Sequence, residues 1–202
     1  MACLQLEEHE IPVGCYYRHL ATMVGDPSLS RLPIDLERNR IQAALRGHRV
    51  IGVHATTGSG KTMKLPETML GVMSNETSRS RWPILLVESS IFGAEKVVHD
   101  LVETFHWRRE AIHMRTGKHG TDKYVLGKTL LSVINYGILW RWLTMDAHGP
   151  IRRYVGILLD EFADLQPKQE QVASLLQAML ARGQLWPEAR LVVTSASLQK
   201  TA

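Results

Sequence analysis

Short apolar runs alternate with amphipathic stretches along most of this chain, from about Leu32 onward. Several of the runs are almost continuously apolar, as is typical of strands that are covered on both faces. These runs predict strands at residues 49–54, 82–88, 111–115, 129–134, 154–159 and 190–195. Residues 1–30 show no sustained period and contain several Gly and Pro residues, so we expect an extension there and one domain over residues 31–202.

The stretches between the runs have the period of helices. In two of them the apolar residues recur on one helical face, which predicts that this face packs on a core. One stripe consists of Val172, Leu175, Leu176, Met179 and Leu180, and the other of Val97, Val98, Leu101, Val102 and Phe105. Alternation of strands and helices over this length predicts an α/β fold, in which a mostly parallel sheet is covered by helices on both faces. Ligands of such sheets bind at the carboxyl ends of the strands.

Composition narrows the class of protein. The 202 residues are 45% hydrophobic and 22% charged, which is typical of a globular domain. No segment approaches the roughly 20 apolar residues that a membrane span requires, and the acidic first residues do not resemble a targeting signal. Cys3 and Cys15 alone do not make a disulfide framework, so we expect an intracellular protein, cytoplasmic or nuclear, with no membrane partner. The formal charge of +4 permits an anionic partner such as nucleic acid.

A phosphate-binding pattern lies between the first predicted strand and the helix that follows it. Its glycines at 58 and 60 let successive backbone N–H groups point at phosphate oxygens. Lys61 can reach the β- and γ-phosphates, and the Thr62 hydroxyl can ligate Mg²⁺. We therefore expect a P-loop that binds ATP through Ala55, Thr56, Thr57, Gly58, Ser59, Gly60, Lys61 and Thr62. The alternative interpretation is an ordinary turn between a strand and a helix.

Two acids follow the predicted strand at 154–159. Asp160 could hold Mg²⁺, and Glu161 could orient the attacking water and accept its proton. The catalytic residues that we expect are thus Lys61, Asp160 and Glu161, with Thr62 and Asp160 as metal ligands. The alternative is that the two acids cap the next helix.

A third element completes a recognisable order of motifs. The strand at 190–195 ends in small hydroxyl residues, Ser195 and Ser197, which neighbouring strands would place near Asp160. A phosphate loop, an acidic pair and a Ser-Ala-Ser element in this order resemble the first RecA-like domain of superfamily 2 helicases, and most of all the DEAH/DExH group. In that family the third motif links ATP hydrolysis to domain movement, so the resemblance implies a coupling role for Ser195 and Ser197.

The resemblance extends over about residues 31–200. Leu32-Pro33-Ile34, with Arg38 and the helix at 39–46, looks like the entry of that group into its first strand. The segment from Ser132 to Leu139 is similar to motif Ib, which touches the nucleic-acid backbone in the family. Asn135 offers hydrogen bonds and Gly137 leaves room for a sugar-phosphate chain, which fits that role. The alternative for this segment is a plain strand, turn and helix.

The chain also departs from the family pattern. Asp160-Glu161-Phe162-Ala163 resembles motif II of the family, whose fourth residue is histidine where this chain has Ala163. In the Ser-Ala-Ser element, which resembles motif III, Ser197 replaces a threonine. The arginine that usually follows a proline in motif Ia is missing from residues 88–91. Hydrolysis chemistry is therefore better supported than contact with a nucleic-acid strand.

The resemblance implies an ATP-dependent RNA helicase-type NTPase that couples Mg·ATP hydrolysis to movement on a strand. In the family a second RecA-like domain, in cis or in trans, supplies arginine fingers and closes over ATP, and these 202 residues end directly after motif III. The expected partners are single-stranded RNA and such a domain. A degenerate nucleotide-binding or interaction module without helicase activity is the alternative, and another P-loop ATPase acting on protein or small molecules is a third.

Overall fold

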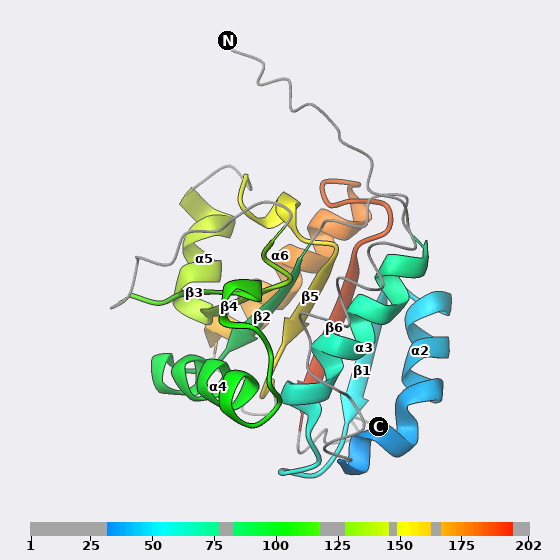
Figure 1. The fold of residues 1–202 in the computed structure, drawn as a ribbon. Coiled ribbons are helices and arrows are strands. Elements are labelled where there is room, and N and C mark those ends of the chain that lie inside the picture. Colours follow the sequence, from blue (N-terminus) through cyan, green and yellow to red (C-terminus); the bar gives the residue numbers. More distant parts are fainter. Residues whose placement is uncertain (1–31, 77–82, 118–127, 146–148, 163–166, 196–202) are drawn as a thin grey trace.

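The computed structural model describes residues 32–76, 83–117, 128–145, 149–162 and 167–195. Within them, six parallel strands form one sheet in the order β1-β6-β5-β2-β4-β3 (Figure 1). The strands are β1 (Val50–His54), β2 (Ile84–Glu88), β3 (Ile112–Arg115), β4 (Leu131–Asn135), β5 (Gly156–Leu159) and β6 (Arg190–Ser195). The predicted strands and the predicted α/β fold are thus confirmed. Residues 1–30 lie outside the described residues, and the extension stays a prediction.

Helices connect the strands and follow the predicted pattern. The α-helices are α2 (Arg38–Gly47), α3 (Lys61–Glu76), α4 (Ile91–Glu103), α5 (Tyr136–Met145) and α6 (Pro167–Ala181). Short 3₁₀ segments are η1 (Pro33–Glu37), η2 (Arg109–Ala111) and η3 (Ile151–Arg153). Gly183, with a positive φ of 65°, follows the end of α6, as its position after an apolar stripe suggests. No helix of the described residues is long and apolar enough to cross a membrane.

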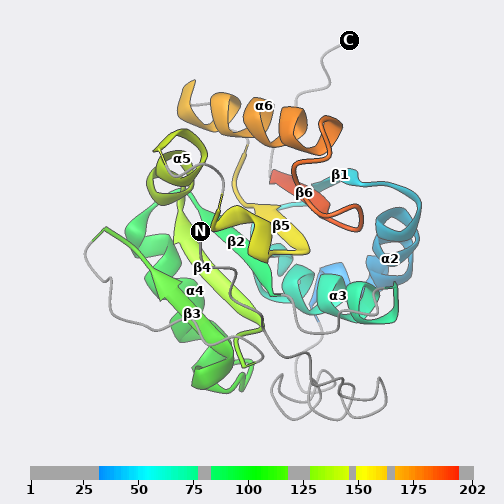
Figure 2. The same cartoon turned by 90° about the horizontal axis from the view of Figure 1, so that it is seen from above.

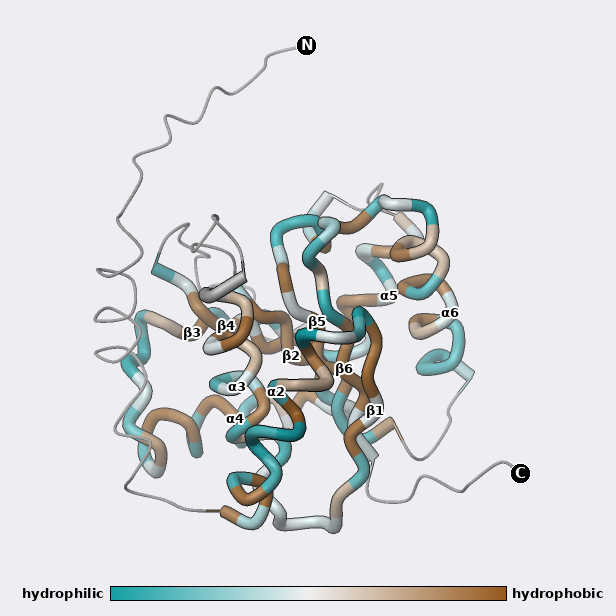
Figure 3. Tube along the Cα trace, turned by 90° about the vertical axis from the view of Figure 1, so that its right-hand side faces the viewer, coloured by the Kyte–Doolittle hydropathy of each residue, from teal (hydrophilic) through white to brown (hydrophobic). Residues whose placement is uncertain are grey.

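The helices form two layers around the sheet. Seen from above, α5 and α6 cover one face, and α2, α3 and α4 cover the other (Figure 2). In β2 the alternation of side chains serves both layers, since Leu86 packs with the α3 and α4 side while Leu85 and Val87 pack with the α5 and α6 side. The strands are therefore mostly hydrophobic along their length, as Figure 3 shows. A sheet buried in this way is rigid and holds its strand ends in fixed positions.

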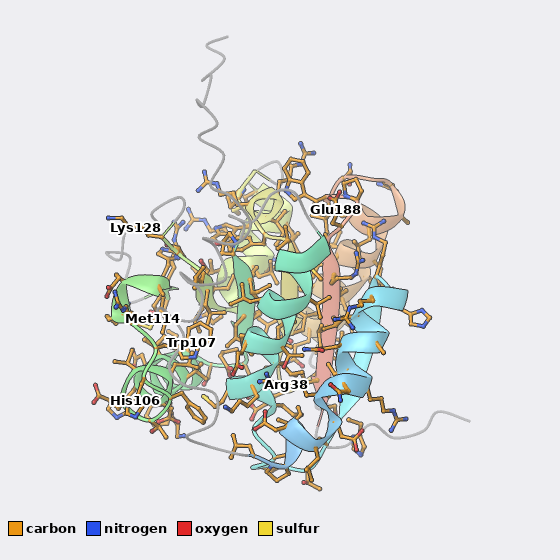
Figure 4. All side chains as sticks on the ribbon, turned by 45° about the vertical axis from the view of Figure 1, so that its right-hand side comes forward. Arg38, His106, Trp107, Met114, Lys128 and Glu188 are labelled. Atoms are coloured by element: carbon orange, nitrogen blue, oxygen red, sulfur yellow. The ribbon has the colours of Figure 1, made fainter. Side chains whose placement is uncertain are left out.

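An ion-paired contact joins the first helix to the helix after the phosphate loop. Arg38, which lies at the start of α2 (Figure 4), donates from Nη2 to Glu67 of α3 at 2.5 Å. Glu67 also lies 3.7 Å from Nζ of Lys64, whose side chain is buried and lies over the Phe105 ring. This network fixes α3, and with it the phosphate loop that leads into α3.

Candidate functional site

The loop between β1 and α3 has the backbone shape that its glycines predict. Gly58 and Gly60 have positive φ angles of 77° and 90°, a region that a residue with a side chain seldom adopts. A Cβ atom added to Gly60 would lie 2.4 Å from Cδ1 of Leu32, so the segment that enters the domain packs directly on the loop. The N–H of Ile34 donates to the carbonyl of Ser59 at 3.1 Å and fixes this contact. The Leu32-Pro33-Ile34 segment and the phosphate loop, which the family resemblance alone had related to each other, are therefore in contact.

Lys61 is the first residue of α3, and its side chain turns back over the loop. Its Nζ donates to the carbonyl of Ala55 and, at 2.9 Å, to that of Thr56. The residue is only 9% exposed, so the ammonium group lies inside the curve of the loop. Ser59, two residues before Lys61, has a buried hydroxyl group with no hydrogen-bond partner in the structure. A buried hydroxyl without a partner leaves a donor for a ligand such as a phosphate oxygen.

The Asp160 carboxylate follows β5 and gathers hydroxyl groups from two other parts of the chain. The Thr62 hydroxyl donates to Oδ2, and the Thr194 hydroxyl of β6 donates to Oδ1. Oδ1 also accepts the N–H of Glu161 at 3.0 Å. Asp160 is 2% exposed, so these bonds hold it in a single place. The structure thus brings together the two predicted metal ligands, which are 98 positions apart in sequence.

Glu161 has an unusual backbone and a defined side-chain partner. Its φ is 51°, in the left-handed region, which costs a residue other than glycine about 1 kcal/mol or more. The Ser89 hydroxyl, one residue beyond β2, donates to Oε2 at 3.1 Å. The described part of α6 is Pro167–Ala181, and residues 163–166 lie outside the described residues, so the helix-cap alternative stays open.

Glu88 is a buried acid beside this pair that the sequence interpretation had passed over. It ends β2, is 4% exposed, and has one carboxyl oxygen, Oε1, without a hydrogen-bond partner in the structure. Burial, and then the negative charges of Asp160 and Glu161, raise the pKa of Glu88 to about 8. The Tyr136 hydroxyl, which donates to the Asp160 carbonyl at 3.3 Å, also has a raised pKa because of burial and of the same acids.

Thr194, Glu88 and Ser89 are thus neighbours of the acids that our sequence interpretation did not include. Thr194 directly precedes the Ser-Ala-Ser element, and Glu88 and Ser89 stand where motif Ia was sought. A charged residue at the end of an apolar run was the available signal for Glu88, because such a residue falls at the carboxyl edge of the sheet.

The remaining predicted residues lie along the same edge or outside the described residues. Oδ1 of Asn135 accepts the N–H of Ile138 at 3.0 Å and so caps α5, which follows β4 directly. Gly137 lies in the first turn of that helix. A Cβ atom added to it would lie 3.4 Å from the same oxygen. Ser195 is fully buried, and its carbonyl accepts the N–H of Ala55 at 3.3 Å. Ser197 and Ala163 lie outside the described residues.

The donor set fits a hydrated magnesium ion bound with a nucleotide. Thr62 and Asp160 offer a hydroxyl and a carboxylate, both hard oxygen donors. Within the described ranges, no group of three or more His, Cys, Asp or Glu side chains is arranged to hold a metal. Mg²⁺ suits such a sparse site, because it keeps several waters and takes the remaining ligands from phosphates.

Comparison with known proteins shows that this chain is similar to parts of helicases. No protein-family model matches this chain. The ATP-dependent RNA helicase DHX30 of Rattus norvegicus and that of Mus musculus are each 29% identical to it over 75 residues, which make up 35% of this chain and 6% of each relative. The crystal structure of the Escherichia coli DEAH/RHA helicase HrpB has a TM-score of 0.67 at 23% identity and covers 84% of this chain. The crystal structure of the E. coli DExH-box NTPase HrpB has a TM-score of 0.69 at 22% identity and covers 87% of this chain.

The fold of these neighbours confirms the predicted resemblance to the RecA-like domain of DExH-type helicases. This chain spans about 20% of the HrpB chains and about 6% of the DHX30 sequences.

The buried Glu88 should make stability depend on pH. Its pKa is about 8 in the folded chain against an ordinary value of 4.5, so the folded state retains a proton that the unfolded state releases. In buffer without metal or nucleotide, this residue's contribution falls as pH rises from about 4.5 through 8, by at most about 1.4 kcal/mol per pH unit. Glu88→Gln removes this contribution, so its stability relative to the parent should increase with pH. Urea unfolding of both proteins between pH 6 and 8 measures this difference in the free energy of unfolding. If the free energies of the two proteins change in parallel with pH, the raised pKa of Glu88 is contradicted.

Proposed function

We propose that this chain is the ATP-binding domain of a DExH-type nucleic-acid helicase. The observation that carries the proposal is the hydrogen bond from Thr62 to Asp160, which joins the phosphate loop to the acid after β5. Both side chains are magnesium-type donors at the carboxyl edge of a parallel sheet. P-loop NTPases hold Mg²⁺ with a Ser or Thr of the loop and an Asp at the end of a strand, so the pairing supports this class.

Each residue then has a defined task. Mg·ATP, when bound, supplies the phosphoryl group that is transferred and a metal charge that neutralises the phosphates. Lys61 would neutralise the charge of the β- and γ-phosphates with its ammonium group. Thr62 and Asp160 would hold the metal, and Glu161 would orient water and accept its proton. Ser89 restrains the Glu161 carboxylate and so limits the directions in which that carboxylate can accept a proton.

We further propose that the partner is single-stranded RNA, contacted at Asn135 and Gly137. The RNA preference is supported by the family resemblance and by the DHX30 relatives, which are named ATP-dependent RNA helicases. Asn135 uses its oxygen to cap α5, so its amide NH₂ group is the donor suited to a phosphate or sugar oxygen. A second RecA-like domain, in cis or in trans, would close over the nucleotide and convert hydrolysis into movement.

Lys61→Ala should weaken binding of Mg·ATP by about tenfold to a hundredfold, because a hydrogen bond from a charged donor contributes about 1.5–3 kcal/mol. Isothermal titration calorimetry measures the change. Lys96→Ala is the matched control, since Lys96 is an exposed lysine of α4 that pairs with Asp100 at 2.7 Å. The control should bind like the parent, and unchanged affinity in Lys61→Ala would refute the assignment of the loop.

Glu161→Gln should preserve ATP binding and reduce turnover by about a hundredfold or more, because a neutral amide cannot accept the proton of the attacking water. The measurement is steady-state phosphate release by a protein that joins residues 1–202 to a second RecA-like domain. If the variant turns over at the parent's rate, Glu161 is not the general base.

The 202 residues alone should bind ATP but hydrolyse it barely above background, with or without single-stranded RNA. An arginine finger contributes roughly three to five orders of magnitude in related sites. The arginines at 108, 109, 152 and 153 precede β3 and β5, at the edge of the sheet opposite to Asp160. Phosphate release by the purified chain tests this expectation. RNA-stimulated turnover of about 1 per second or faster would show that the chain completes its own site.

A further inference from the structure

The end of β2 contacts both acids of the candidate site. Val87 pairs with Leu159 across the sheet, and the N–H of Asp160 donates to the Val87 carbonyl at 3.0 Å. The next residue of each strand therefore comes side by side, which places Glu88 against Asp160. One position further, the Ser89 hydroxyl donates to Glu161. Two consecutive residues after the apolar part of β2 thus meet two consecutive acids after β5.

The Glu88 carboxyl group is held on one side and unsatisfied on the other. It lies against the carboxyl group of Asp160, because the register of β2 and β5 puts the two residues side by side. Behind it lies Gly93 in the first turns of α4, where an added Cβ would come within 3.0 Å of Oε2. Oε1 is buried and has no hydrogen-bond partner in the structure. Glycine at position 93 therefore leaves room for a carboxyl group that the surrounding protein only half satisfies.

A buried polar oxygen without a partner destabilises the fold, so native proteins seldom leave one unless a ligand or a bound water supplies the partner. A carboxyl oxygen beside a magnesium-type donor set accepts hydrogen bonds from water on the metal, because Mg²⁺ keeps several of its waters when it binds to protein. Second-shell groups of this kind orient the ligands that touch the metal directly.

We propose that Glu88 is a positioning residue of the magnesium site, which holds the Asp160 carboxylate through one oxygen and accepts a hydrogen bond from a metal-bound water through the other. The proposal rests on the proposed function, because it requires that Thr62 and Asp160 bind Mg²⁺. It assigns a metal-directed role to a position where the DExH resemblance showed only a missing arginine.

The test is the gain in ATP affinity that Mg²⁺ produces, measured on the full chain by calorimetry with Mg²⁺ and with EDTA. Glu88→Met keeps the size of the side chain and removes both oxygens, and it should reduce this gain by about 10- to 100-fold. Glu88→Gln keeps a donor and an acceptor in the same shape, so it should retain the gain to within about threefold. The ATP affinity in EDTA and the thermal unfolding midpoint report whether each variant is folded.

Ser90→Ala is the matched control beside Glu88. The Ser90 hydroxyl accepts the N–H of Gly93 at 2.9 Å and caps α4, so its loss lowers the unfolding midpoint but leaves the acids untouched. It should keep the full gain from Mg²⁺. Glu88→Ala replaces Glu88→Met if that variant does not fold.

The outcomes separate the two proposals. A parent chain that binds no ATP in either condition overturns the proposed function and this inference with it. A parent that gains affinity from Mg²⁺, together with a folded Glu88→Met or Glu88→Ala variant that gains as much, overturns the inference alone. Loss of the gain in Glu88→Gln as well would also overturn it, because a positioning role requires only hydrogen bonds that the amide can make.

Discussion

The carboxylate of Asp160 joins three distant parts of the chain, and the candidate site depends on it. It receives hydroxyl groups from the phosphate loop and from the end of β6, and it lies against Glu88 at the end of β2. These contacts are possible because parallel strands in register bring their carboxyl ends to one edge. A shift of β5 by one residue would turn Asp160 toward the opposite face and break all of them together.

The electrostatics of this edge follow from the same packing. Three acids gather where the sheet ends, and two of them are buried. Burial disfavours a second negative charge beside Asp160, so Glu88 retains its proton at neutral pH. A divalent cation would relieve the accumulated charge, whereas the protein compensates for it with hydroxyl donors and a proton. In the proposed function, this acidic edge is the place of the divalent cation.

The sequence predicted the strands because their apolar runs are nearly continuous, and it predicted the phosphate loop because its glycines and lysine have fixed spacing. It could not predict Thr194 or Glu88 as neighbours of Asp160. Their proximity depends on β5 lying between β6 and β2, an order that differs from the order along the chain. Asn135 illustrates a different limit, since a residue type suited to nucleic acid also suits the cap of the helix that it precedes.

The folded-back side chain of Lys61 has a consequence for how tightly the loop can bind. Its ammonium group donates to the carbonyls of both Ala55 and Thr56, so the side chain holds these two residues at the start of the loop together. A phosphate would exchange one set of partners of this cation for another, and the backbone would lose little conformational entropy in the exchange. In the proposed function this lysine would therefore serve the loop twice, as a tie between its residues and as a cation for the phosphates.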